Sequence, residues 1–140
     1  MTLLALHLAL TAAYAGFQWT VRALVYPQFA EVPSAGFPAY ERRHQQRISR
    51  IVGPLFVGQG VTTLWLLVDR PPGIPLSGVL LSAAWLAVVL GATGLLAVPL
   101  HRRLGERWDA AAHRRLLRVD TVRLGAACGG AATALWLVLH

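Results

Sequence analysis

Residues 74–98 read IPLSGVLLSAAWLAVVLGATGLLAV and contain no charged side chain. About 20 apolar residues in a helix cross the roughly 30 Å hydrocarbon core of a bilayer, so this segment is long enough to span a membrane. The whole chain is similar in character, because 56% of its 140 residues are hydrophobic and its mean hydropathy is +0.53. Soluble domains of this size carry less apolar sequence. The sequence therefore predicts a single integral membrane domain, residues 1–140, surrounded by the lipid bilayer.

Three further apolar segments complete a predicted all-α bundle of four transmembrane helices, with spans at about 2–26, 48–68, 74–98 and 119–139. We expect Pro27 to end the first span and Pro99 to end the third, because proline lacks the N–H that continues a helix. The turn at 71–73 is so short that the second and third spans should form an antiparallel hairpin. The fourth helix should begin near Trp108 or Asp109, ahead of its span.

The charged residues predict an orientation. All 13 basic residues are arginines, and only Arg70 lies between the second and third spans. The other twelve lie in or beside the two remaining connections, which the positive-inside rule places in the cytoplasm. The arginine-only, alanine-rich composition is typical of a GC-rich bacterial genome, so we expect a multi-pass protein of the bacterial cytoplasmic membrane with both termini outside. Topology then explains the net charge of +7, and nucleic acid is not expected as a partner.

The two halves of the chain share residues at an offset of 72. The matches are Pro27 with Pro99, Arg42–Arg43 with Arg114–Arg115, Gly53 with Gly125, and Gly58 with Gly130. Each half would then be a hairpin of the same orientation, as in membrane folds built from parallel repeats. Chance matches arise easily in this composition, so duplication stays a hypothesis. Small residues recur every fourth position at Ala5, Ala9 and Ala13 and at Gly125 and Gly129, which favours close helix contacts.

Polar residues follow one face of the first span, at His7, Thr11, Tyr14, Gln18, Arg22 and Tyr26. Residues three or four apart share a helix face, and polar groups in a membrane bundle face inward. A second stripe runs through Tyr40, His44 and Arg47, and a third through Asp109, His113, Asp120 and Arg123. We expect the three stripes to converge at the cytoplasmic end of the bundle.

The convergence predicts a ligand-binding cluster made of Arg22, Tyr26, Tyr40, His44, Arg47, His113, Asp120 and Arg123. Guanidinium groups bind planar oxyanions with two hydrogen bonds, so the cluster suits an anionic or carbonyl-rich group. The alternative is that these side chains only fix topology and bind lipid headgroups. Arg22, Asp120 and Arg123 fall within helical runs, which favours a buried role for them, either in a site or in a structural pair.

Cofactor binding has weaker support in the sequence. His44, His101 and His113 are candidate metal ligands by position, but their spacing matches no zinc or di-iron motif. His7 is a candidate axial ligand for haem, and the alternative is a hydrogen-bonded core histidine. No nucleophile, phosphate-binding or dinucleotide motif occurs, so catalytic residues are unassigned.

Two stretches resemble a group of uncharacterised small bacterial membrane proteins. They are residues 16–54, with YPQF at 26–29 and FPAYERRH at 37–44, and residues 98–123, VPLHRRLGERWDAAAHRRLLRVDTVR. The resemblance implies four helices and a shared polar cluster. More distantly, the span layout is similar to that of the anthrone oxygenases, which oxidise aromatic polyketides. Leu6–His7 and the ERR segment at 41–43 resemble the haem-containing membrane protoporphyrinogen oxidase, whose third-helix lysine has no counterpart here.

Three functions follow as hypotheses. In the first, the protein binds and oxidises an aromatic, quinone-like or isoprenoid-linked small molecule, whose oxygens are oriented by Arg22, His44, Arg47, His113 and Arg123. This would make it a membrane oxidoreductase. In the second, it is a non-enzymatic component: a partner subunit, a lipid binder or a small transporter acting as a homodimer. In the third, it is a haem- or metal-binding redox protein.

Overall fold

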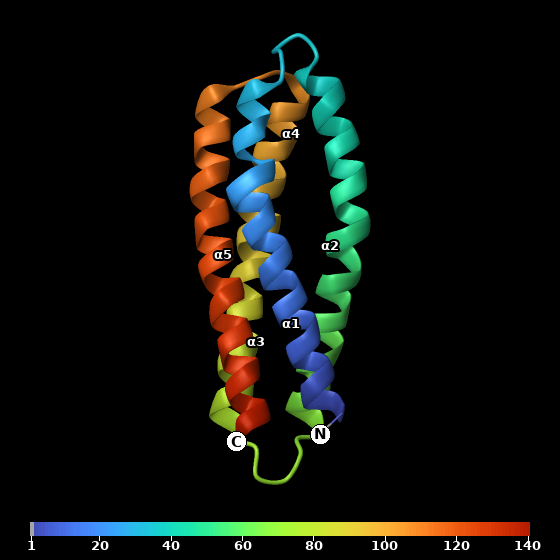
Figure 1. The fold of residues 1–140 in the computed structure, drawn as a ribbon, viewed down its shortest axis with the longest axis vertical. Coiled ribbons are helices and arrows are strands. Elements are labelled where there is room, and N and C mark those ends of the chain that lie inside the picture. The colour runs from blue at the N-terminus through green and yellow to red at the C-terminus, as the bar shows by residue number, and fades with distance from the viewer. Residues whose placement is uncertain (1) are drawn as a thin grey trace.

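The computed structural model describes residues 2–140 and is an all-α bundle of four long helices (Figure 1). Two of the four are uninterrupted, and the other two contain a π-helical segment. In chain order the elements are α1 (Thr2–Thr20), π-helical η1 (Val21–Val25), 3₁₀-helical η2 (Pro27–Glu31), α2 (Phe37–Val68), α3 (Leu76–Ala92), π-helical η3 (Thr93–Ala97), α4 (Val98–Glu106) and α5 (Ala110–Leu139).

The helices run antiparallel to their chain neighbours, so both termini lie at the same end of the bundle (Figure 1). The connection between α2 and α3 lies at that end too. The helix α5 packs against α1 and α3, and α2 packs against α1, α3 and α4. Contact between α2 and α3 confirms the predicted hairpin.

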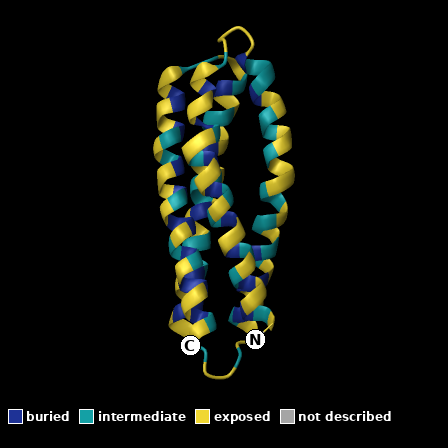
Figure 2. Cartoon of the chain, viewed as in Figure 1, coloured by how far each residue is buried: buried dark blue, intermediate teal, exposed yellow. Residues whose placement is uncertain are grey.

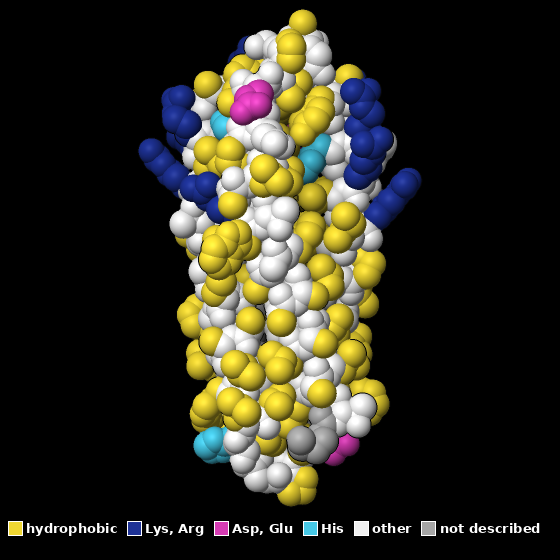
Figure 3. Space-filling model, in the orientation of Figure 1, with side chains coloured by type: hydrophobic (Ala, Val, Ile, Leu, Met, Phe, Trp, Pro, Cys, Tyr) yellow, Lys and Arg dark blue, Asp and Glu magenta, His cyan; other side chains and the backbone are white. Residues whose placement is uncertain are grey.

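Within residues 2–140, three helices are long and apolar enough to cross a membrane: α2, the continuous helix Leu76–Glu106, and α5. The first helix falls outside this group because its buried face carries His7, Tyr14 and Gln18, which lower its hydropathy. Large apolar side chains cover much of the outer surface (Figure 3). Val57 is 67% exposed and Leu95 is 78% exposed, as expected for a protein whose surroundings are lipid.

The prediction that Pro99 ends the third helix is wrong, because the helix continues to Glu106. The π-helical segment η3 lies directly before this proline, and the N–H of Val98 donates to the carbonyl of Thr93. A π turn is wider than an α turn and shifts the carbonyl that the proline ring would otherwise meet. The prediction for Pro27 is confirmed, since the first helix ends at Val25 and Pro27 begins η2.

The two π-helical segments lie at equivalent places in the two halves. The bounds of η1 and η3 differ by 72 residues, which is the offset of the matched residues, and each segment is followed by a proline within two residues. π turns are rare in proteins. Their occurrence at the same offset, each before one of the matched prolines Pro27 and Pro99, agrees with duplication and is linked to that residue match.

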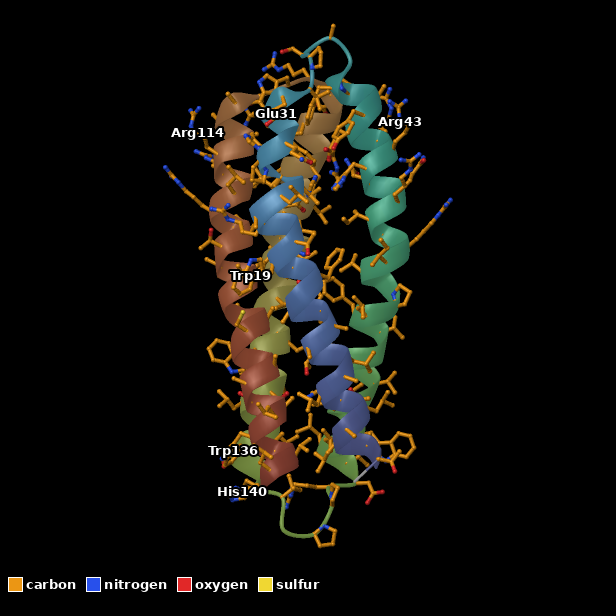
Figure 4. All side chains as sticks on the ribbon, in the orientation of Figure 1. Trp19, Glu31, Arg43, Arg114, Trp136 and His140 are labelled. Carbon is orange, nitrogen blue, oxygen red and sulfur yellow. The ribbon has the colours of Figure 1, made fainter. Side chains whose placement is uncertain are left out.

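The arginine-rich segments extend the helices and are not loops. The helix α2 begins at Phe37, well before the span expected from residue 48, and α4 carries the chain to Glu106. The fourth helix begins at Ala110 with Asp109 as its N-cap, as predicted. Exposed arginines gather toward the end of the bundle opposite the termini (Figure 3), where Figure 4 labels Arg43 and Arg114.

The small-residue stripes are only partly used for packing. Ala5, Ala9 and Ala13 are exposed, so the predicted close contact is wrong for the first helix. Gly129 does lie against the indole ring of Trp85.

Replacing Asp109 with alanine is expected to lower the melting temperature by a few degrees. Its Oδ1 accepts hydrogen bonds from the backbone N–H groups of Ala111 (2.9 Å) and Ala112 (3.0 Å), and Oδ2 lies 2.7 Å from Arg103 Nε. Together these partners, chiefly the N–H of Ala112, lower the pKa of Asp109. A lowered pKa stabilises the fold above the unfolded pKa, and the contribution is lost as the pH falls through the folded value.

The difference in melting temperature between the native protein and D109A should therefore be constant from about pH 7 to pH 5 and shrink below about pH 4. Thermal melts in detergent, followed by circular dichroism, measure it. A difference that persists unchanged at about pH 2 would contradict this account of the cap.

Candidate functional site

The polar face of the first helix points into the bundle, as predicted. His7, Thr11, Tyr14, Gln18 and Tyr26 are each at most 5% exposed. Figure 2 shows buried positions along the inner sides of the helices and exposed ones outside. Two hydrogen-bonded groups and one cavity occupy the part of the bundle toward the arginine-rich end.

The first group is a closed ring of four buried side chains from the first helix and α5. Tyr14 Oη donates to Gln18 Oε1 (2.9 Å), and Gln18 Nε2 donates to Asp120 Oδ1 (2.6 Å). Arg123 closes the ring by donating to Asp120 Oδ1 (3.0 Å) and to Tyr14 Oη (3.4 Å). Asp120 Oδ2 and Arg123 Nε are buried and have no partner. The ring therefore holds the guanidinium in place and leaves one of its N–H groups available.

The second group joins three helical segments in a line of hydrogen bonds. His101 Nδ1 lies 2.6 Å from Glu41 Oε1, and His101 Nε2 lies 2.8 Å from Tyr26 Oη. An ionised carboxylate only accepts hydrogen bonds, so Nδ1 carries the proton and Nε2 accepts from the Tyr26 hydroxyl. Gln45 Nε2 supports the group by donating to Glu41 Oε1 (3.1 Å) and to the His101 carbonyl (3.2 Å).

A cavity of about 130 Å³ lies between these two groups. Half of its lining residues are apolar: Phe17, Val21, Ile48, Val52, Ala97 and Val98. The others are polar: Tyr26, Gln45, Ser49, Thr93, His101 and Arg123. Both π-helical segments border the cavity, through Val21 in η1 and through Thr93 and Ala97 in η3. The cavity therefore lies where the first and third helices depart from α-helical geometry.

The cavity is partly open, and its exposed lining residues show where. Ser49 on α2 is exposed, and Val98 at the start of α4 is 46% exposed. The rim therefore lies between α2 and the helix Leu76–Glu106, on the side of the bundle.

Of the predicted cluster, Tyr26 and Arg123 line the cavity, and Asp120 holds Arg123. His44 lies beside the second hydrogen-bonded group, with its ring centroid 5.8 Å from that of His101 and 4.9 Å from that of Phe29. Burial lowers the pKa of His44, and Glu41 opposes this shift. Tyr40 is half-buried and stacks on His44 with centroids 6.5 Å apart.

The other three predicted residues do not reach the cavity. Arg47 is exposed and does not line the cavity, because the inward face of α2 passes through Glu41 and Ile48 instead. Arg22 is half-buried at the edge and donates to Thr121 Oγ1 (2.9 Å). His113 is buried and donates from Nε2 to the Tyr26 carbonyl (2.7 Å), which fixes the chain where the first helix ends.

Glu41 and Gln45 were missed as site residues by sequence reasoning, and His101 was considered only as a candidate metal ligand. Glu41 is fully buried. The sequence does indicate this burial, because Glu41 lies four residues after Phe37 and seven before Ile48 and so shares their otherwise apolar helix face. His101 is four residues after Ala97 and shares its helix face. If the helix is assumed to end at Pro99, His101 is not part of it, and its shared face with Ala97 cannot be recognised.

The predicted cofactor ligands do not fit a cofactor in this geometry. Thr62 Oγ1 donates to the Gly58 carbonyl (2.9 Å), so it accepts from His7 Nδ1 (2.9 Å), and His7 Nε2 accepts from Ser82 Oγ (2.8 Å). The adjoining cavity measures about 10 Å³, room for one water but not for a porphyrin. Among residues 2–140, no group of three or more His, Cys, Asp or Glu side chains is placed to hold a metal ion.

Comparison of the chain with protein-family models, with curated proteins and with solved structures gave no match.

Proposed function

We propose that this is a four-span protein of the bacterial cytoplasmic membrane that binds a ring-bearing hydrophobic small molecule, aromatic or quinone-like, in the cavity between its two polar groups. The observation that carries the proposal is Arg123. Its guanidinium is buried at the wall of the cavity, and its Nε has no protein partner. Buried charged donors are normally satisfied, so an oxygen of a bound molecule is the natural partner for this N–H.

The size of the cavity favours one ring. An engineered apolar cavity of about 150 Å³ holds benzene, and this cavity has a volume of about 130 Å³. Phe17, Val52 and Val98 would contact the faces and edges of the ring, while Tyr26 and Arg123 would bind its oxygens. Small-molecule sites combine apolar walls with polar groups placed to fix the orientation of the ligand, and this lining has both.

The position of the rim favours a ligand that arrives from the bilayer. Ser49 and Val98 lie on the side of the bundle, so a hydrocarbon or isoprenoid tail attached to the ring would extend into lipid. The arginine-rich end would face the cytoplasm. The helix formed by residues 2–25 would also cross the membrane, in addition to the three long apolar helices. At 1.5 Å per residue it measures about 36 Å, which is long enough to span the bilayer.

Duplication accounts for the architecture of the site. In this proposal two ancestral hairpins of the same orientation contribute one π-helical segment each, and the cavity forms where the two segments face each other. The equal offset of η1 and η3 and their shared place in the cavity lining support it.

Replacing Ala97 with phenylalanine is expected to fill the cavity and weaken ligand binding by more than about tenfold, or roughly 1.4 kcal/mol. Ala97 is 1% exposed and lines the cavity. Calorimetric titration of the purified protein in detergent with two one-ring probes, 4-nitrophenol and 4-nitroanisole, measures the affinity. The matched control is Ala87→Phe, since Ala87 is exposed on the outer side of the same long helix.

Equal affinities of the native protein and A97F, or absence of binding of both probes to the native protein, would overturn the proposal. If A97F does not fold, Val98→Trp tests the same point from the rim, where the side chain is 46% exposed. Mass spectrometry of a solvent extract of the native protein, compared with the same extract of A97F, would identify the natural occupant.

A further inference from the structure

We infer that Glu41, His101 and Tyr26 form a proton relay that takes the proton of an acidic ring hydroxyl, so that the cavity selects phenols or hydroquinones and holds them as anions beside Arg123. The inference rests on the proposed function, because it concerns the occupant of the same cavity. It adds the class of ligand and the chemistry of the bound state.

The relay has a defined direction. Glu41 accepts from His101 Nδ1 at 2.6 Å, and His101 Nε2 accepts from Tyr26 Oη at 2.8 Å. The Tyr26 oxygen therefore uses its hydrogen toward His101. It lies beside the Arg123 guanidinium, and it keeps a lone pair that can accept from a group in the cavity that Tyr26 lines. A ligand hydroxyl matches this arrangement, whereas an ether or a hydrocarbon has no hydrogen to donate.

The proton step is balanced within the site. The ligand O–H bond breaks as its proton moves to Tyr26 Oη, and the Tyr26 proton moves to His101 Nε2. The product is a ligand oxyanion and an imidazolium, and the imidazolium remains hydrogen-bonded to the Glu41 carboxylate. No electron is transferred and no other reactant is consumed. Because the proton stays in the site, its net charge does not change, which avoids the cost of burying an extra charge.

The surrounding charges suit both products. From α2, Glu41 and the neutral His44 face His101, and Tyr26 faces it from the end of the first helix. From α5, Arg123 lines the same cavity and is paired with Asp120 through one of its terminal nitrogens. The free Nε of Arg123 can donate to the oxyanion, while Glu41 stabilises the imidazolium.

The test uses 4-nitrophenol, whose anion absorbs visible light and whose neutral form does not. Binding to the native protein in detergent should lower the apparent pKa of the dye by on the order of one pH unit. Glu41→Gln keeps the shape of the side chain and removes its charge, so the imidazolium loses its counter-charge and the apparent pKa of the bound dye should rise toward its free-solution value. Glu106→Gln, at an exposed glutamate on α4, is the matched control and should behave like the native protein.

Two further measurements distinguish failure of the proposed function from failure of the proton relay. The methyl ether 4-nitroanisole has no acidic proton and should bind equally to the native protein and E41Q, which shows that the cavity is intact. Tyr26→Phe should abolish the pKa shift as E41Q does, and it serves if E41Q does not fold. Absence of binding of both nitrophenol and nitroanisole to the native protein would overturn the proposed function. Binding without a pKa shift, or a shift that survives in both E41Q and Y26F, would overturn the relay alone.

Discussion

Replacing Asp120 with alanine is expected to destabilise the protein by roughly 3–5 kcal/mol, the range seen when one partner of a buried ion pair is removed. Asp120 is fully buried, and its Oδ1 accepts from both Gln18 and Arg123. Without the carboxylate, a guanidinium that is 5% exposed would lose its counter-charge. The alanine would also remove the acceptor of the Gln18 amide. Unfolding in mixed micelles with increasing dodecyl sulfate measures the loss.

Three comparisons show whether the loss arises from the unpaired cation. Asp69→Ala, at an exposed residue after α2, should change stability by less than about 0.5 kcal/mol. Asp120→Asn keeps an acceptor for Gln18 and should cost less than D120A. The double variant D120L/R123L removes both charges and should be more stable than D120A, since the unpaired cation is gone. A double variant as unstable as D120A would show that the cost comes from packing instead.

The inward face of the first helix could be predicted because it depends on one helix only. His7, Thr11, Tyr14 and Gln18 recur with helical spacing, and this fixes their common direction whatever the neighbours are. Their partners could not be predicted in the same way. Gln18 bonds to a residue 102 positions away, and that pairing depends on which helices are adjacent and at what height.

The positions of Arg47 and His101 differ from those expected, and each difference has a physical cause. Tyr40, His44 and Arg47 have helical spacing, but so do Phe37, Glu41 and Ile48. Only packing against η2 and α4 decides which face of α2 is buried. His101 was treated as a loop residue because Pro99 was expected to end the helix, and a single π-helical segment overrides that rule. Sequence spacing gives no sign of a π turn.

The cavity itself also depends on the π-helical segments. A regular bundle fills its interior with interlocking side chains, and space of about 130 Å³ needs a local departure from that packing. Here η1 and η3 supply the departure at equivalent positions of the two halves. Tyr26, Asp120 and Arg123 could thus be anticipated from the sequence, but Glu41, Gln45 and the space between the two groups could not.

Replacing Gly129 with leucine is expected to destabilise the bundle by roughly 3 kcal/mol, because the added side chain has no room. A Cβ at Gly129 would lie 2.7 Å from Cε2, 2.9 Å from Cζ2 and 3.0 Å from Cδ2 of Trp85. All three atoms belong to one rigid ring, so the indole would have to move as a whole, out of the contact between α3 and α5. Unfolding in mixed micelles measures the loss, as for D120A.

Gly125 is the matched control, since it lies one helical turn earlier on α5 and a Cβ there meets nothing within 4 Å. Gly125→Leu should be neutral or should stabilise the helix by up to about 1 kcal/mol, because glycine is a poor helix former. If the clash with the indole causes the destabilisation, Gly129→Leu should stabilise the protein once the indole has been removed. In a Trp85→Ala background, which alone leaves a hole, Gly129→Leu should recover stability because the leucine fills part of the vacated space. A loss of the same size in both backgrounds would show that the glycine is needed for some reason other than close packing of α3 against α5.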